Sequence, residues 1–192
     1  MRLFLVLSVL AASVQADWRL ALPGWKYEFP ADHQNHPEFK TEWWYFTGNL
    51  DAADGRQFGY QLTFFRQGVR PLDSDIIPLS HFATSSVKFA HFAVSEVSGS
   101  AFHFFQRLSR GAYGEAGFGR APRLVWIEDW SCTLDDEGTF RIKASADDLS
   151  LELALKAAKP LVIHGRDGVS RKADGEGRAS HYYSFTRLSS EG

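Results

Sequence analysis

Two side chains near the end of the sequence, His181 and Tyr183, have the types and the spacing for proton transfer. They stand two residues apart, and Phe185 stands two residues further on. In an extended strand such residues point the same way, so an imidazole, a phenol and an apolar ring would line one wall. Polar groups of this kind inside an aromatic pocket suit general acid–base chemistry on an apolar substrate. The alternative is that both side chains only form hydrogen bonds with structural neighbours.

Other familiar catalytic patterns are missing from the sequence. No serine stands in a Gly-x-Ser-x-Gly motif, no glycine-rich loop precedes Lys-Ser or Lys-Thr, and His-Glu-x-x-His does not occur. The usual signatures of serine hydrolases, nucleotide-binding proteins and zinc proteases are therefore absent. Four further histidines lie on or near expected strands, where each is either a site residue or a structural one: His81, His91, His103 and His164.

A strongly aromatic strand supplies one more candidate group, the carboxylate of Glu42. Read with a period of two, residues 41–50 place Trp44 and Phe46 on the same face as Glu42 and place Trp43 and Tyr45 on the other. Both faces are therefore apolar, and an unpaired carboxylate would be costly on either. Glu42 is either solvated at the end of the strand or held in a buried network as a structural or functional group.

The polar loop just before this strand contains two histidines, His33 and His36, beside Asp32 and Glu38. These four are side chains that metal ions accept as ligands. The spacing lacks a helix to align them and a further ligand nearby, so we expect no metal site. The interpretation that we favour over a metal site is a surface loop or the lip of a site.

The composition describes an aromatic, weakly acidic chain. Aromatic residues make up 15% of it, which suits either an aromatic core or a pocket for a flat or apolar ligand. The formal charge is −2, and loss of Arg2 with residues 1–16 would change it to −3, so no basic surface for nucleic acid is expected. Cys132 is the single cysteine, which excludes an internal disulfide and a site with several cysteine ligands.

The first sixteen residues follow the pattern of a secretory signal peptide. Arg2 precedes an apolar run from Leu3 to Leu10, and small residues lead to an expected cleavage site after Ala16. The apolar run is too short for a stable membrane span, and no cysteine follows to accept a lipid. We therefore expect a secreted or periplasmic protein with a mature chain of residues 17–192; an uncleaved anchor is the alternative.

The mature chain is expected to be all-β. Apolar and polar residues alternate in short runs between turn signals, and no segment has a helical period. This pattern predicts an antiparallel up-and-down barrel or a strongly bent sheet, with an immunoglobulin-like sandwich as the alternative. The expected strands are 41–50, 56–66, 81–87, 89–97, 101–108, 124–134, 139–145, 149–156 and 179–188.

The segments between and around these strands have expected roles as well. Residues 17–30 contain Trp18 and Trp25 and are expected to pack over the core as an extended arm. Residues 109–122 contain four glycines and predict a loop, which is either a lid or portal or a plain connection. The sequence ends in a turn-like segment without a following strand, which predicts a barrel that is incomplete at its C-terminus.

Several of these motifs together resemble the AttH/CrtC family of secreted, lipocalin-like proteins. The family includes relatives of carotenoid 1,2-hydratase (hydroxyneurosporene synthase) and of kievitone hydratase. The resemblance extends over nearly the whole mature chain. It rests on Phe29-Pro30-Ala31-Asp32-His33, His36-Pro37, the block Glu42 to Leu50, the strand Phe58 to Arg66, Ala90-His91-Phe92-Ala93-Val94, Glu128-Asp129-Trp130 and Ser180-His181-Tyr182-Tyr183-Ser184.

The resemblance implies a fold, an activity and a set of site residues. It implies that residues 17–192 are the N-terminal lipocalin-like domain of a two-domain protein, and that a catalytic aspartate of the hydratases would follow Gly192. It also implies cofactor-free acid catalysis, in which His181 and Tyr183 assist protonation of an isoprenoid double bond. The residues expected to bind the ligand are Glu42, Trp43, Trp44, Tyr45, Tyr60, His91, Trp130 and Phe185.

Three functions remain open at this level. The first is a hydratase or hydrolase acting on an isoprenoid or lipid-like substrate. The second is a non-catalytic carrier of an apolar small molecule, with an export system as its partner. The third is a scaffold whose cavity is filled by its own tryptophans. None of the three requires nucleic acid, a metal or an organic cofactor.

Overall fold

The structure, a computed structural model, describes residues 17–71 and 83–192. The expected signal peptide at residues 1–16 lies outside the described residues, as do His81 and the start of the strand expected at 81–87. Within the described ranges, no helix has the length and apolar character that crossing a bilayer requires.

The first half of the chain forms an antiparallel sheet of four strands in sequence order. Short turns join β1 to β2 and β3 to β4, so the sheet is a simple meander. Its strands are β1 (Thr41–Asp51), β2 (Gln57–Gly68), β3 (Ser86–Glu96) and β4 (Ala101–Ser109). Because β1 has only β2 as a ladder partner, β1 is an edge strand of this sheet.

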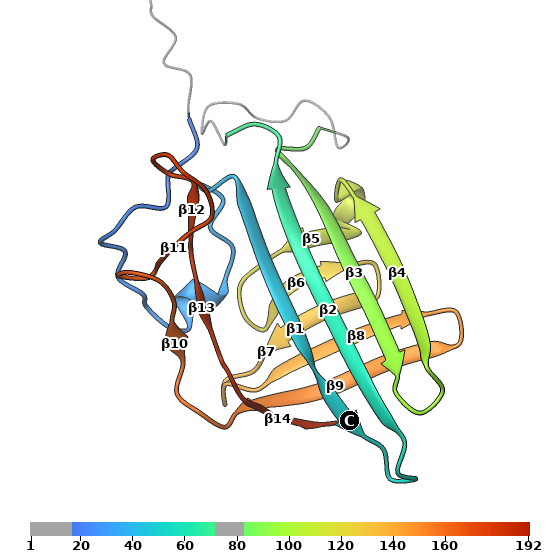
Figure 1. Ribbon diagram of the computed structural model, residues 1–192. Helices are drawn as coiled ribbons and strands as arrows, with labels where there is room; N and C mark the ends of the chain where they lie inside the picture. The colour runs from blue at the N-terminus through green and yellow to red at the C-terminus, as the bar shows by residue number, and fades with distance from the viewer. Residues whose placement is uncertain (1–16, 72–82) are drawn as a thin grey trace, which may run out of the picture.

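The second sheet has six antiparallel strands and lies behind the first at a steep angle (Figure 1). Five of its strands again follow sequence order, and the last strand of the chain joins the edge beside β9. The six are β5 (Ala116–Phe118), β6 (Arg123–Ile127), β7 (Trp130–Leu134), β8 (Phe140–Ala146), β9 (Leu149–Ala157) and β14 (Leu188–Glu191).

A third group of segments lies beside the free edge of β1 (Figure 1). The N-terminal arm and the short helical turn η1 (Ala31–His33) pack there against two small strand pairs, β10 with β13 and β11 with β12. These four strands are β10 (Val162–Ile163), β11 (Val169–Arg171), β12 (Ala179–His181) and β13 (Tyr183–Ser184). A second helical turn, η2 (Ala112–Gly114), precedes β5.

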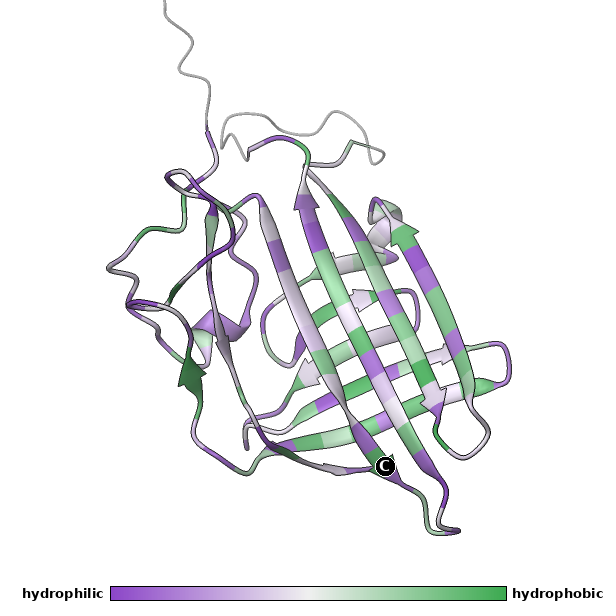
Figure 2. Ribbon diagram, viewed as in Figure 1, coloured by the Kyte–Doolittle hydropathy of each residue, from purple (hydrophilic) through white to green (hydrophobic). Residues whose placement is uncertain are grey.

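The core lies between the two large sheets because their strands alternate apolar and polar side chains (Figure 2). In β2 the inward side chains Tyr60, Leu62 and Phe64 are all buried, as the alternation predicts. The opposing layer is built mainly from β6 to β9, where Leu124, Val125, Ile127, Trp130, Cys132, Ile142 and Leu155 are almost fully buried.

The all-β, antiparallel prediction is confirmed. Strand connections run up and down within each sheet, so the alternative of an immunoglobulin-like sandwich does not apply. No ladder between described strands joins the four-stranded sheet to the six-stranded one. The barrel is thus two facing sheets rather than a hydrogen-bonded cylinder, with the arm and the small strand pairs at one open side (Figure 1).

Five expected elements differ from the structure. The strands expected at 81–87 and 89–97 form one strand, β3, which begins at Ser86, and the C-terminal segment expected as a turn is β14, which pairs with β9. The expected strand 124–134 is a hairpin of β6 and β7, because Glu128 adopts a positive φ of 55° that suits a tight two-residue turn. The expected strand 179–188 is divided into β12, β13 and β14, because each piece pairs with a different strand. The expected loop 109–122 contains η2 and β5, since β5 extends the second sheet.

Candidate functional site

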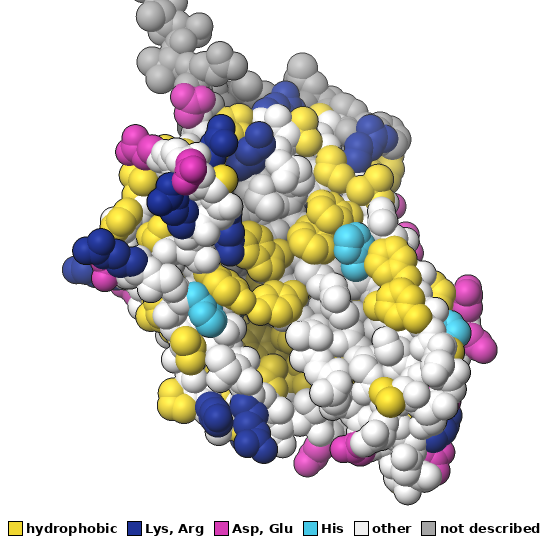
Figure 3. All heavy atoms as spheres, viewed as in Figure 1, with side chains coloured by type: hydrophobic (Ala, Val, Ile, Leu, Met, Phe, Trp, Pro, Cys, Tyr) yellow, Lys and Arg dark blue, Asp and Glu magenta, His cyan; other side chains and the backbone are white. Residues whose placement is uncertain are grey.

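A cavity lies at the free edge of β1. Its volume is about 990 Å³, and it is bounded by the N-terminal arm, by both sides of β1 and by the segment from β12 to β14. Figure 3 shows a hollow with hydrophobic side chains between the sheet and the C-terminal strand pairs. A cavity of this size and lining accommodates a drug-sized or lipid-sized apolar molecule.

Seven of the ten expected site residues line this cavity. Trp44 and Phe185 belong to its inner wall, where both pack against the core. Trp43 and Tyr45 lie on the opposite face of β1, as the alternation predicts, and Tyr45 is 40% exposed. The remaining three that line the cavity are Glu42, His181 and Tyr183.

The other three expected site residues lie away from the cavity. Tyr60 is buried between the sheets, and its ring lies close to Gly48. Trp130 is fully buried in the core, where its Nε1 donates to the Ser145 carbonyl. His91 points outward from β3 among the rings of Phe65, Phe89 and Phe104.

Glu42 is held in a network of charged groups rather than solvated at the end of β1. The Nε of Arg66 donates to its Oε2 at 2.9 Å, and the backbone N–H and Nδ1 of His36 lie 2.8 and 3.0 Å from its Oε1. The Arg66 side chain is 4% exposed and that of Glu42 is 13% exposed. Arg66 also donates to the carbonyls of His36 and Phe39, so this ion pair ties the polar loop to the sheet.

The loop histidine His36 joins this network to Asp32. Its Nε2 lies 3.1 Å from Oδ1 of Asp32, while its Nδ1 faces Glu42. Burial lowers the pKa of His36, but the hydrogen bond to Glu42 and the charges of Glu42, Asp32 and Glu38 outweigh it and raise the pKa. A protonated His36 therefore donates to two carboxylates. The described residues contain no cluster of three or more His, Cys, Asp or Glu that could hold a metal.

His33 and Tyr183 form a second polar link, 150 residues apart in sequence. The hydroxyl of Tyr183 donates to the Asp32 carbonyl at 2.8 Å, so His33 Nδ1, 2.9 Å away, must carry the proton that it donates to the Tyr183 oxygen. Burial lowers the pKa of His33 to about 4 against a smaller opposing effect of Asp32. His33 is thus a neutral, buried imidazole.

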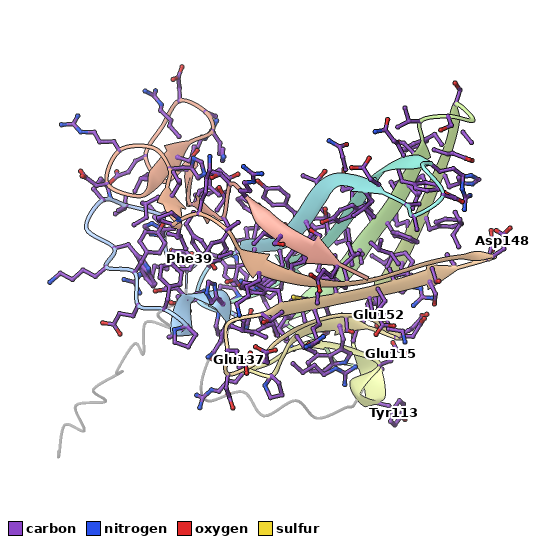
Figure 4. All side chains as sticks on the ribbon, turned by 90° about the horizontal axis from the view of Figure 1, so that it is seen from below. Phe39, Tyr113, Glu115, Glu137, Asp148 and Glu152 are labelled. Atoms are coloured by element: carbon purple, nitrogen blue, oxygen red, sulfur yellow. The ribbon has the colours of Figure 1, made fainter. Side chains whose placement is uncertain are left out.

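His181 differs from these histidines because its side chain has no hydrogen-bond partner among the described residues, and its Nδ1 is buried. Its ring packs against Trp25 and Phe39, with centroids 5.0 and 5.4 Å away. Figure 4 shows Phe39 within this dense packing of the arm against the C-terminal strand pairs. Burial and the nearby charges of Arg19 and His36 lower the pKa of His181. The ring is therefore neutral at pH 7 and able to accept a proton.

Several residues of this site were missed by the sequence reasoning. The hairpin register pairs Glu42 with Arg66, and this partner was available from the turn that joins β1 to β2. Trp25 had been assigned only to the arm, yet its Nε1 donates to Asp32 at 3.1 Å. Tyr182 has no expected role in the sequence, yet its hydroxyl lies 2.6 Å from that of Tyr45 and so links the C-terminal strand pairs to β1.

Comparisons with known proteins agree on one family. The model of the AttH-like family matches residues 20–192. A crystal structure from Nitrosomonas europaea, which carries the AttH name provisionally, superposes with a TM-score of 0.79 at 33% identity. The match covers 91% of this chain and 51% of that one, so the chain spans about half of its neighbour's length. The curated proteins contain no match.

Proposed function

The chain belongs to the AttH-like family, and we propose that its cavity binds an apolar, isoprenoid-like or lipid-like molecule on which His181 performs acid–base chemistry. The observation that carries the proposal is a neutral imidazole without a hydrogen-bond partner among the described residues, set in a largely aromatic cavity. Because Nδ1 is buried, the nitrogen open to a substrate or a water molecule is Nε2, and no described residue forms a hydrogen bond with it.

Among the two reaction classes that the family resemblance suggests, hydrolysis fits His181 better than alkene hydration. A neutral His181 can take a proton from water while the water oxygen bonds to a carbonyl carbon, and can then return that proton to the leaving alcohol. Alkene hydration begins instead with proton donation to carbon. The acids that could donate such a proton are the two carboxylates of the cavity wall, Asp32 and Glu42. Both are engaged by His36, and Glu42 also by Arg66, so neither is available as a proton donor to carbon.

We expect Tyr183 to position the loop rather than to transfer a proton. Burial and the charge of Asp32 raise its pKa far above the usual value, and its hydroxyl is already occupied by Asp32 and His33. Replacing Tyr183 by phenylalanine should lower the free energy of unfolding by about 2 kcal/mol, because two buried polar groups lose their partner. Urea denaturation measures this loss. Turnover per folded molecule should change by less than about tenfold, and a loss of 10² or more, the range of general acid–base catalysis, would instead make Tyr183 a proton donor.

The proposal is tested first by ligand retention and then by turnover. Native mass spectrometry of the freshly purified protein should reveal a bound apolar molecule, which extraction and mass analysis identify. The His181→Gln variant should bind that molecule with similar affinity but turn over its ester or hydratable form about 10²-fold more slowly, since general-base catalysis is worth at least this much. Wild-type activity should be lost on acidification, but only at a pH lower than that at which a free histidine titrates, because burial lowers the pKa at which His181 becomes protonated.

The matched control is His103→Gln, which alters an exposed histidine of β4 outside the cavity. This variant should match the wild type in binding and turnover. Unchanged turnover in His181→Gln would contradict the catalytic role, and an empty cavity together with no measurable binding of apolar molecules would contradict the binding role as well.

A carrier without catalytic activity is the second candidate, favoured because the acidic, histidine and tyrosine side chains around His181 already have partners. Asp32, His33, His36, Glu42 and Tyr183 all have partners within the protein. Retention of a ligand without turnover of any unsaturated or ester lipid would select this function. We propose that either function operates outside the cytoplasm, on the basis of the expected signal peptide, and an export system is a candidate partner.

A further inference from the structure

The hairpin of β11 and β12 presents two cations side by side toward β1. The backbone N–H of Lys172 donates to the carbonyl of Arg178 at 2.9 Å, which continues the ladder that pairs Arg171 with Ala179. Directly opposed residues of an antiparallel pair project to the same side. By the same alternation, Ser180 and Tyr182 project with Lys172 and Arg178, and all four line the cavity.

This face of the hairpin lies against the outer side of β1. The Nζ of Lys172 lies 5.9 Å from the ring centre of Trp43 and 5.1 Å from that of Tyr182. The ring of His164 stacks on that of Tyr182, with ring centres 4.4 Å apart. The cations therefore sit at the mouth of an aromatic groove, and Figure 3 shows basic side chains gathered around the upper part of this hollow.

The positive charge at this mouth lacks an acidic partner among the described residues. Lys172 donates to the hydroxyl of Ser170 at 3.1 Å, and neither Lys172 nor Arg178 takes part in an ion pair there. Of the two acids in the turn of this hairpin, Asp174 is engaged by Arg171, and Glu176 is exposed and does not line the cavity. Since the carboxylates of the cavity wall are also paired, the cavity carries uncompensated positive charge at one end.

We propose that Lys172 and Arg178 bind the carboxylate of an amphiphilic ligand whose apolar chain runs along Trp43 and Tyr45 into the cavity. The inference rests on the proposed function and makes the ligand class narrower: an apolar chain with a free carboxylate at one end rather than a wholly neutral molecule, so that any bond that His181 hydrolyses lies elsewhere in the same ligand. An Arg guanidinium holds a carboxylate with two parallel hydrogen bonds, and a Lys ammonium adds a point charge. The aliphatic stems of both side chains cover the first methylene groups of the ligand.

The test compares one acyl chain with and without its charge. Hexadecanoic acid and its methyl ester are titrated into the protein at pH 7.5 and 50 mM salt, below their aggregation concentrations, and tryptophan fluorescence or calorimetry gives the Kd values. We expect the acid to bind about five- to tenfold more tightly than the ester, as two exposed cations permit. The preference should decrease in 500 mM salt because of screening.

Two variants locate the charge effect. The double variant Lys172→Met with Arg178→Met should lose the preference for the acid while it keeps the wild-type affinity for the ester. The control Lys159→Met, which removes an exposed lysine outside the cavity, should keep the preference. Circular dichroism verifies that the variants are folded.

The outcomes separate this inference from the proposed function. Equal affinity of the wild type for acid and ester overturns the carboxylate site but leaves apolar binding intact. A preference that survives in the double variant also overturns it, because the carboxylate then lies elsewhere. Binding of neither compound, nor of the corresponding alcohol, overturns the proposed function itself.

Discussion

Replacing Arg66 by methionine is expected to lower the free energy of unfolding by about 3–5 kcal/mol, the largest effect of any single change considered for this fold. The substitution leaves the mostly buried carboxylate of Glu42 with His36 as its only charged partner, while a similar volume of side chain remains. It also removes the donor to the carbonyls of His36 and Phe39. Urea denaturation followed by tryptophan fluorescence measures the loss.

The control for this prediction is Arg56→Met on the turn between β1 and β2. Arg56 pairs with Asp54 at 2.8 Å, but both side chains are more than half exposed, so the loss of stability should be much smaller than that of Arg66→Met. The double variant Arg66→Met with Glu42→Gln should recover part of the stability, because the uncompensated charge is then removed. A loss below 1 kcal/mol for Arg66→Met alone would show that water or another group compensates Glu42.

The part of the fold that could be predicted from the sequence is the part set by local pattern. Alternation in β2 placed Tyr60, Leu62 and Phe64 on one face, and that face is the core. The turn between β1 and β2 fixes the register, and counting inward from it places Glu42 opposite Arg66. The buried network of Glu42 was therefore accessible from sequence, and the alternative of a solvated end-of-strand carboxylate is wrong.

What could not be predicted depends on contacts between distant segments. No local signal places His33 beside Tyr183, because the two residues are separated by nearly the whole domain. The division of residues 179–188 into three strands follows from pairing with β11, β10 and β9 in turn, which a single-strand pattern does not reveal. The segment 166–178 is charged and largely exposed, and no pattern in the sequence reveals its position at the cavity mouth.

The same distant contacts explain why the site residues were only partly found. His91 and Trp130 belong to motifs of the family resemblance, which does not say on which side of a sheet a residue lies. Strand alternation sends His91 to the outer face and Trp130 into the core. Both sides of β1 border the cavity because β1 is an edge strand, so Trp43 and Trp44 contribute from opposite faces. A closed barrel would have admitted only one of these faces.

The free energy of unfolding is expected to decrease strongly as the pH falls, because of His33. Its pKa is about 4 in the folded protein and about 6.5 in an unfolded chain, so between these values the unfolded state binds more protons. Because its pKa is depressed, the contribution of His33 to stability is fully present above about pH 6.5 and decreases as the pH falls toward 4. Integrated over that window, the loss amounts to about 3 kcal/mol.

The reference for this prediction is His33→Asn, whose side-chain amide can still donate to the Tyr183 oxygen but does not titrate. His36 acts in the opposite sense, because its raised pKa contributes stability that is present below about pH 6.5 and is lost as the pH rises through the folded value. His36 and the carboxylates remain in both proteins, so the difference between the two stability curves isolates His33. Urea denaturation at pH 7, 6, 5 and 4 should show the wild type losing about 3 kcal/mol relative to the variant. Parallel curves, or an NMR titration in which His33 titrates near pH 6.5, would contradict a neutral buried imidazole at this position.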